Sequence, residues 1–150
     1  TESAKLLVKY EKRSILLRTQ RHIDVGAARE LASFSGDNLW FHGVKHLDTN
    51  VARELAAFSG KEMSFNYLHR LDAELAREFA GFKVENLKLL GVNRMDEDTA
   101  TKIAGFQGKT LDLSGLRWID TATATALLPI VDRLRCDRRI KQKILRQKSK

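Results

Sequence analysis

A unit of 24 residues, present five times without a gap from residue 13 to residue 132, constrains this chain more than any other feature. Equivalent positions agree in size and polarity from copy to copy. The most regular columns are Ile15, Leu39, Met63, Leu87, Leu111; Asp24, Asp48, Asp72, Asp96, Asp120; and Ala28, Ala52, Ala76, Ala100, Ala124. A fixed period of this length is typical of a solenoid, in which each unit packs on its neighbours. The sequence therefore predicts one elongated repeat domain.

Each unit predicts a short strand, a turn and a helix. In residues 37–60, Leu39 and Phe41 alternate with outward positions, which is the period of a half-buried strand. Ala52 and Leu55 then share one face of a helix, and Gly60 is expected to end that helix in a left-handed conformation. Strands stack about 4.8 Å apart whereas helices are about 10 Å wide, so stacking predicts parallel strands inside a curve and helices outside.

The aspartate column allows two interpretations. A ladder of carboxylates can serve metal binding or acid–base chemistry. The favoured interpretation is structural: each aspartate directly precedes a predicted helix, where its side chain accepts a bond from a free backbone N–H and complements the helix dipole. On that interpretation, Asp72→Ala destabilises the fold without abolishing any binding.

Three segments carry a family resemblance: NLWFHGVKHLD (38–48), NLKLLGVNRMD (86–96) and TLDLSGLRWID (110–120). They resemble leucine-rich repeats, and most of all the alanine-rich bacterial kind, over residues 13–130. The resemblance implies an α/β fold, a right-handed β/α solenoid shaped like a horseshoe, which binds proteins through its concave strand face. The Asn or Cys usual after the strand is absent, so the internal Asn ladder is missing or replaced by apolar packing. The positions concerned are Gln20, Val44, Leu68, Val92 and Leu116.

We expect a solenoid over residues 1–132, with a half repeat over 1–12, followed by a cap helix and basic tail over 133–150. Residues 4–12 fit the helix half of a unit, because Ala4, Leu7, Val8 and Tyr10 match the apolar helix columns. The chain therefore opens inside a repeat, either as a cap or as a piece of a longer array. Pro129 interrupts the last repeat, and a weak helical spacing then predicts a capping helix that runs into a frayed tail.

Charge is concentrated at the C-terminal end. The chain has a net charge of +8, and residues 133–150 alone hold nine Lys and Arg residues against one Asp. Residues 1–132 are consequently neutral, so the chain reads as a basic tail on a neutral scaffold.

The strand alternation places one set of side chains outward on the concave side. Trp40 and Leu16 fall on adjacent units and resemble the aromatic and aliphatic anchors of protein interfaces. The alternative is a tryptophan folded under the N-terminal cap or exposed by chance. Ser14, Ser64 and Asp112 are predicted to be exposed on the same face. The predicted partner-binding residues are Leu16, Arg18, Trp40, His42, Lys88 and Leu90.

A second candidate surface runs along the strand-to-helix turns, where each unit carries basic or aromatic residues before its aspartate. Stacking makes them a basic stripe for an acidic partner or a phosphate backbone, unless the neighbouring aspartates neutralise it. The tail offers nucleic acid or an anionic membrane a further site, unless it is only a solubilising segment. The predicted anion-binding residues are Arg21, Lys45, Arg70, Arg94 and Arg117 on the stripe, and Arg138, Arg139, Lys141 and Lys143 in the tail.

Catalysis has little support in the sequence, which lacks a glycine-rich phosphate loop, a Ser–His–Asp set and a Cys–His cluster. Cys136 lies among cations that are expected to lower its pKa, but no His is near it in sequence. His22 and His46 make a weak metal signal. We expect a non-enzymatic protein without cofactor, metal or small-molecule substrate. A cytoplasmic location is favoured, although a missing N-terminus leaves export open.

Overall fold

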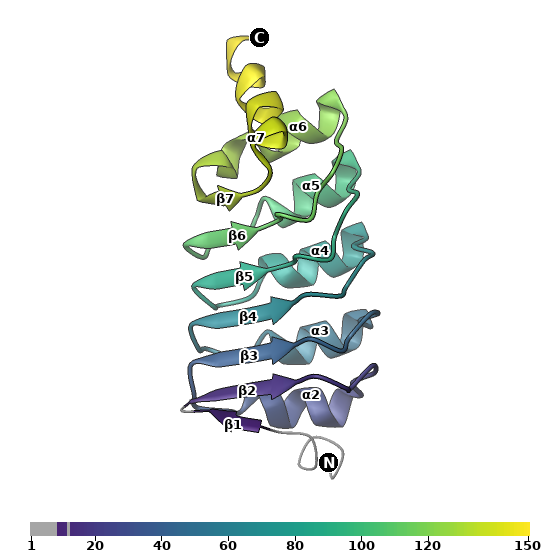
Figure 1. The fold of residues 1–150 in the computed structure, drawn as a ribbon, viewed down its shortest axis with the longest axis vertical. Helices are drawn as coiled ribbons and strands as arrows, with labels where there is room; N and C mark the ends of the chain where they lie inside the picture. The colour runs from purple at the N-terminus through teal and green to yellow at the C-terminus, as the bar shows by residue number, and fades with distance from the viewer. Residues whose placement is uncertain (1–8, 12) are drawn as a thin grey trace.

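The computed structural model describes residues 9–11 and 13–150, and it is an α/β repeat structure (Figure 1). Six parallel strands alternate with helices along the chain. The strands are β2 (Ser14–Leu17), β3 (Asn38–Phe41), β4 (Glu62–Phe65), β5 (Asn86–Lys88), β6 (Thr110–Asp112) and β7 (Leu134–Arg135). The helices are α2 (Val25–Ala32), α3 (Thr49–Leu55), α4 (Ala73–Ala80), α5 (Glu97–Ile103), α6 (Thr121–Leu127) and α7 (Arg138–Leu145).

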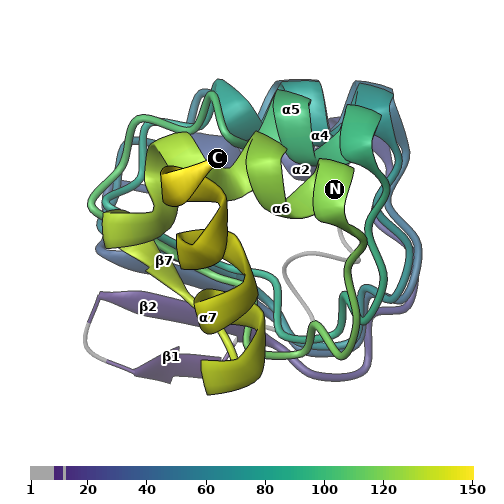
Figure 2. The same ribbon diagram turned by 90° about the horizontal axis from the view of Figure 1, so that it is seen from above.

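The register of the sheet follows the sequence repeat. Ile15 of β2 lies opposite Leu39 of β3, which lies opposite Met63 of β4, and the same column continues through Leu87 to Leu111. Strand neighbours in the sheet are therefore neighbours in sequence throughout. Viewed from one end, helices α2, α4, α5 and α6 lie on one side and the strands on the other (Figure 2).

The core lies between these two layers and repeats its composition from unit to unit. The alanine column, from Ala28 to Ala124, is fully buried, so the helices approach the sheet closely. The turn column is apolar after Gln20, its first member: Val44, Leu68 and Val92 are buried. Apolar packing therefore holds these adjacent turns together.

The aspartate column caps the helices, which confirms the structural interpretation. Asp72 is the N-cap of α4 and its Oδ1 accepts the backbone N–H of Leu75 at 2.8 Å. Asp24, Asp48, Asp96 and Asp120 cap α2, α3, α5 and α6 in the same way. Within the described residues, no group of three His, Cys, Asp or Glu side chains is placed to hold a metal ion.

The prediction that glycines end the helices in a left-handed conformation is wrong. No described glycine has a positive φ, and the residue that ends α3 is Ala56 in a right-handed conformation. Gly60 is needed for space instead. A Cβ there would lie 2.2 Å from Cζ of Phe58 and 2.6 Å from the carbonyl oxygen of Asp37. Gly36 and Gly108 meet the rings of Phe34 and Phe106 in the same way, next to the backbone where the following strand begins.

The N-terminal helix expected over residues 4–12 is wrong where the structure describes it. Lys9–Glu11 form strand β1, which pairs antiparallel with β2. The remaining residues of that expectation, with Ala4, Leu7 and Val8, lie outside the described residues. Arg13 then turns the chain into β2 with a φ of 77°.

The C-terminal segment is folded onto the last repeat instead of fraying. Helix α6 ends at Leu127, and a 3-10 helix, η1 (Leu128–Arg133), carries Pro129 in its first turn. Strand β7 then pairs with β6, but Leu134 lies opposite Leu111, one residue short of the repeat. Helix α7 crosses the end of the stack (Figure 2) and η2 (Arg146–Ser149) follows it. None of the described helices has the length and apolar character needed to cross a membrane.

Candidate functional site

The first candidate surface is the strand face, defined as the outward side chains of β2–β6 and the residues that directly follow these strands. Its central row runs from Leu16 through Trp40, Ser64 and Lys88 to Asp112, because these residues lie opposite one another across the sheet. Leu16 and Trp40 are both half-buried. The register confirms the prediction that these two residues are neighbours on adjacent strands.

Glu62 fixes the middle of the strand face. The indole Nε1 of Trp40 donates a hydrogen bond to Oε1 of Glu62 at 2.8 Å. The ammonium of Lys88, two strands away from Trp40, lies 3.3 Å from Oε2 of the same carboxylate. One carboxylate therefore holds both long side chains in place across three strands.

A shallow depression of about 250 Å³ lies beside this cluster. Trp40, Glu62 and Lys88 line it together with His42, Ser64, Asn66 and Leu90. The pKa of His42 lies below its usual value of 6.5, because partial burial disfavours the imidazolium and, secondarily, because Arg18 is near. His42 is therefore a neutral lining group at pH 7. Five of the six predicted partner-binding residues thus line the depression or lie next to Trp40. The sixth, Arg18, lies close enough to His42 for its charge to lower the pKa of that imidazole.

Three polar residues expected to be exposed on the strand face are buried instead: Ser14, Ser64 and Asp112. Their side chains are short and end close to the sheet. Each makes a hydrogen bond on the face: Ser14 accepts from Asn38 at 2.9 Å, Ser64 donates to Asn66 at 2.7 Å, and Asp112 accepts from Ser114. Ser64 nevertheless lines the depression beside Trp40.

The second candidate surface is the basic edge, defined as Arg21, Lys45, Arg70, Arg94 and Arg117. All five side chains are exposed. None of them has an ion-pair partner within 4.0 Å among the described residues. The carboxylates of the aspartate column turn toward the helix N-termini, so they form no direct ion pair with the described side chains of the stripe.

The four tail cations divide into two kinds. Arg138 and Arg139 are exposed. Lys141 donates to the carbonyl oxygen of Leu134 at 3.0 Å, and Lys143 donates to the carbonyl oxygen of Ile119. The two lysines are consequently engaged in fastening α7 to the last repeat, which sequence spacing did not indicate.

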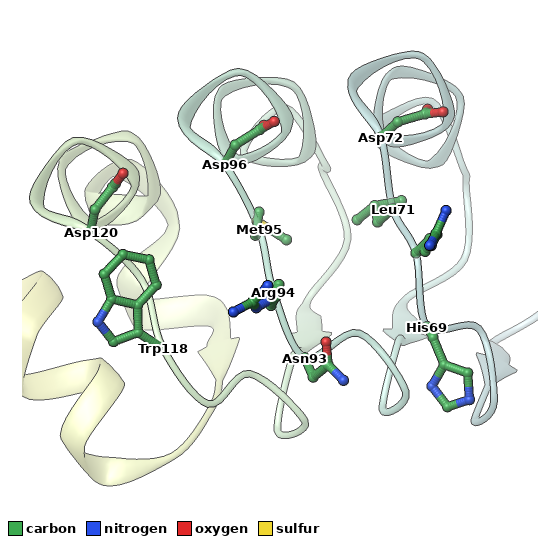
Figure 3. Close-up of a pocket in the computed structure, with 10 residues that line it drawn as sticks. His69, Leu71, Asp72, Asn93, Arg94, Met95, Asp96, Trp118 and Asp120 are labelled. Atoms are coloured by element: carbon green, nitrogen blue, oxygen red, sulfur yellow. The ribbon is translucent and has the colours of Figure 1, made fainter.

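An edge groove of about 810 Å³ adjoins the basic edge, lined by residues 69–72 and 93–96 with Trp118 and Asp120 (Figure 3). In Figure 3 the aspartates lie at the starts of the helices, while His69, Asn93, Arg94 and Trp118 lie nearer the strand ends. Trp118 is 62% exposed, and Nζ of Lys143 lies 5.5 Å from the centre of its ring.

Cys136 is not an activated thiol. Burial raises the pKa of its thiol above the ordinary value of 9.0, and the nearby Lys141 ammonium does not offset this. The expectation that surrounding cations lower its pKa is thus wrong, because desolvation of a half-buried thiolate outweighs their attraction.

Comparison of the chain with protein-family models, curated proteins and solved structures finds no match. The functional argument therefore rests on the chain's own surfaces.

Sequence reasoning placed Glu62 on the strand face and Trp118 on the basic stripe, but it did not predict either as a binding residue. Glu62 begins a strand in an ordinary polar position opposite Asn38 and Asn86, and only its side-chain contacts join it to Trp40 and Lys88. Trp118 occupies a column that otherwise holds His22, His46, Arg70 and Arg94. The change from basic to aromatic in that column was the available signal.

Proposed function

We propose that the chain is a right-handed solenoid of the leucine-rich repeat type. The register of one unit per strand supports this, as does the separation of strands and helices into two layers. A stack of such units offers a continuous strand surface with one row of side chains from each unit. That geometry is well suited to contacts spread over several repeats.

We further propose that the protein is a non-catalytic scaffold that binds a protein partner through the strand face. The observation that carries this proposal is the hydrogen bond from Trp40 to Glu62, with Leu16 beside the indole. A half-buried tryptophan held in one orientation loses little side-chain entropy when a partner packs on it. Interface hot spots are enriched in such aromatic residues.

The charges around Trp40 indicate the character of the partner. Glu62 and Lys88 satisfy each other, and His42 is neutral. Only Arg18 contributes an exposed cation without an ion-pair partner among the described residues. The expected partner therefore presents an apolar or aromatic side chain to the depression and a hydrogen-bonding rim to its polar lining.

Site-specific photocrosslinking tests this proposal. A photoreactive amino acid replaces Leu90 on the strand face, and a matched one replaces Ala57, which is exposed on the helix side. We expect a discrete protein adduct from position 90 that Trp40→Ala suppresses, and no such adduct from position 57. Equal adducts from both positions, or an adduct from position 90 insensitive to Trp40→Ala, would contradict the proposal.

A further inference from the structure

The edge groove combines three features that the strand-face function does not use. The first is Trp118, whose ring is 62% exposed at the edge of a repeat next to α7. Its neighbours in the column, Arg70 and Arg94, are exposed cations. An aromatic surface of this size in water is a stacking platform when charged groups flank it.

The second feature is the set of cations that lies beside that ring. Arg70 and Arg94 have no hydrogen bond or ion pair among the described residues. Lys143 lies over the ring, 5.5 Å from its centre. A phosphate at this position would meet guanidinium groups that give up no existing ion pair in order to bind it.

The third feature is the opposite wall, formed by Asp72, Asp96 and Asp120. Each of these carboxylates accepts one backbone N–H at 2.8 Å. A carboxylate has several acceptor sites, so capacity for further donors remains. In Figure 3 the aspartates lie along one side of the groove, Arg94 lies between them and the strand ends, and the indole of Trp118 lies at one end.

We propose that the edge groove binds a nucleotide unit, with the base stacked on Trp118 and the phosphate held by Arg94 and Arg70. Amino or ring N–H groups of the base donate hydrogen bonds to the carboxylates of Asp96 and Asp120. Carboxylates accept hydrogen bonds from base amino groups in the same way when proteins recognise DNA. The volume of about 810 Å³ lies within the range of small-ligand sites. The two sources of such a unit are a free nucleotide and a single-stranded nucleic acid.

Other anions match the groove less well. An acidic peptide offers carboxylates to Arg70 and Arg94, but its acidic side chains carry no ring to stack on Trp118. In a duplex the base faces are already stacked on one another. Its phosphates can bind the cations, but no base face is available to stack on the indole. An anionic membrane uses the cations but does not require the tryptophan.

The test measures binding of the full chain to labelled single strands of about ten nucleotides, the matching duplex, mononucleotides and anionic lipid vesicles. Trp118→Ala is expected to weaken single-strand binding about fivefold to a hundredfold, and Trp118→Phe to retain much of it. Arg94→Gln is expected to weaken binding. It is also expected to reduce the slope of log affinity against log salt concentration by about 1, the contribution of one phosphate contact. Arg77→Gln, an exposed arginine on α4, is the matched control and is expected to bind like the wild type.

Comparing the ligands separates a free nucleotide from a single-stranded nucleic acid as the source of the bound unit. Mononucleotide binding that depends on Trp118 identifies a free nucleotide as sufficient, and binding of single strands alone identifies a nucleic acid. Equal affinity for single strand and duplex, unchanged binding by Trp118→Ala, or no binding by the wild type would overturn the proposal. Vesicle binding that depends on Arg94 but not on Trp118, without single-strand binding, would assign the edge to a membrane surface. None of these results bears on Trp40 and the strand face.

Discussion

At the scale of single residues, the repeat is maintained by side chains that satisfy or cover the backbone. The aspartate column shows this most clearly, because each carboxylate accepts a backbone N–H that the helix itself leaves without a partner. This role explains why the column is uniform while its neighbours vary. It also explains why these carboxylates form no direct ion pair with the described side chains of the basic edge.

Asp72→Ala is expected to destabilise the protein by about 1 kcal/mol, because the first turn of α4 loses its cap. Asp72→Asn is expected to recover most of that loss, since an amide oxygen also caps a helix. Chemical denaturation followed by circular dichroism measures both. Arg77→Ala is the control on the same helix, and a loss equal to that of Asp72→Ala would contradict the capping role.

The caps also give the stability a defined pH dependence. Hydrogen bonds from Thr99 and Thr123 hold the pKa values of Asp96 and Asp120 below their usual value of 3.8. A carboxyl group with a lowered folded-state pKa stabilises the fold above its unfolded pKa and loses that contribution as the pH falls through the folded value. We therefore expect stability to decline below about pH 4.

The double variant Asp96→Asn, Asp120→Asn isolates this effect. It retains amide caps but cannot titrate, so its stability is expected to fall less steeply between about pH 4 and pH 2 than that of the wild type. Thermal melting across that range measures the difference. Parallel profiles for the two proteins would show that other groups govern the acid sensitivity.

Glycine contributes at the residue scale through space and not through backbone freedom. Gly60→Ala is expected to destabilise by about 1–3 kcal/mol, since its Cβ would overlap the Phe58 ring and the Asp37 carbonyl. Gly81→Ala is the matched control, because the nearest atom to its Cβ is 3.4 Å away. That control is expected to be neutral or mildly stabilising. Denaturation midpoints compare the two, and equal losses would refute the spatial role.

At the scale of elements, the C-terminal cap decides where the stack ends. Strand β7 continues the sheet by only two residues, and α7 then crosses the end with Ile140 and Ile144 buried against the last repeat. Arg133 adds bonds to the carbonyl oxygens of Phe106 and Gly108 at 2.8 and 2.7 Å. The basic segment is therefore part of the folded unit, and its removal would uncover the core of the last repeat.

Ile144→Ala is expected to destabilise the protein by about 2–5 kcal/mol, because the side chain is 0% exposed and its loss leaves a cavity. Leu145→Ala, at a neighbouring position that is 40% exposed, is the control and is expected to cost far less. Hydrogen exchange in α6 and α7 is expected to rise with Ile144→Ala alone. An unchanged exchange rate would mean that α7 does not cap the stack.

The elements also show how far sequence reasoning reached. Periodicity predicted the parallel strands, the helices and their caps, because the same pattern recurs with the same spacing in each unit. It failed at the ends: Lys9–Glu11 form a strand instead of a helix, and β7 shifts the register by one residue. A terminal unit packs on one neighbour only, so tertiary contacts there override the pattern.

At the scale of the whole molecule, the units cohere through contacts between equivalent residues. Phe41 and Phe65 stack with ring centres 4.8 Å apart, and Arg29 and Arg53 form ion pairs with glutamates of the next helix at 3.1 and 3.0 Å. The same stacking brings outward residues of different units into one surface. Trp40 and Leu16 were predictable neighbours for this reason, whereas the Trp40–Glu62–Lys88 cluster depends on side-chain conformations that no spacing encodes.

The most direct test of the central claim uses the whole chain as bait in three forms: wild type, Trp40→Ala and Arg77→Ala. Bound proteins are quantified by mass spectrometry at high salt after nuclease treatment, which removes partners held only by charge or nucleic acid. The strand-face account predicts a protein retained by the wild type and Arg77→Ala and lost from Trp40→Ala. Retention of the same protein by all three forms, or no protein retained by the wild type, would contradict it.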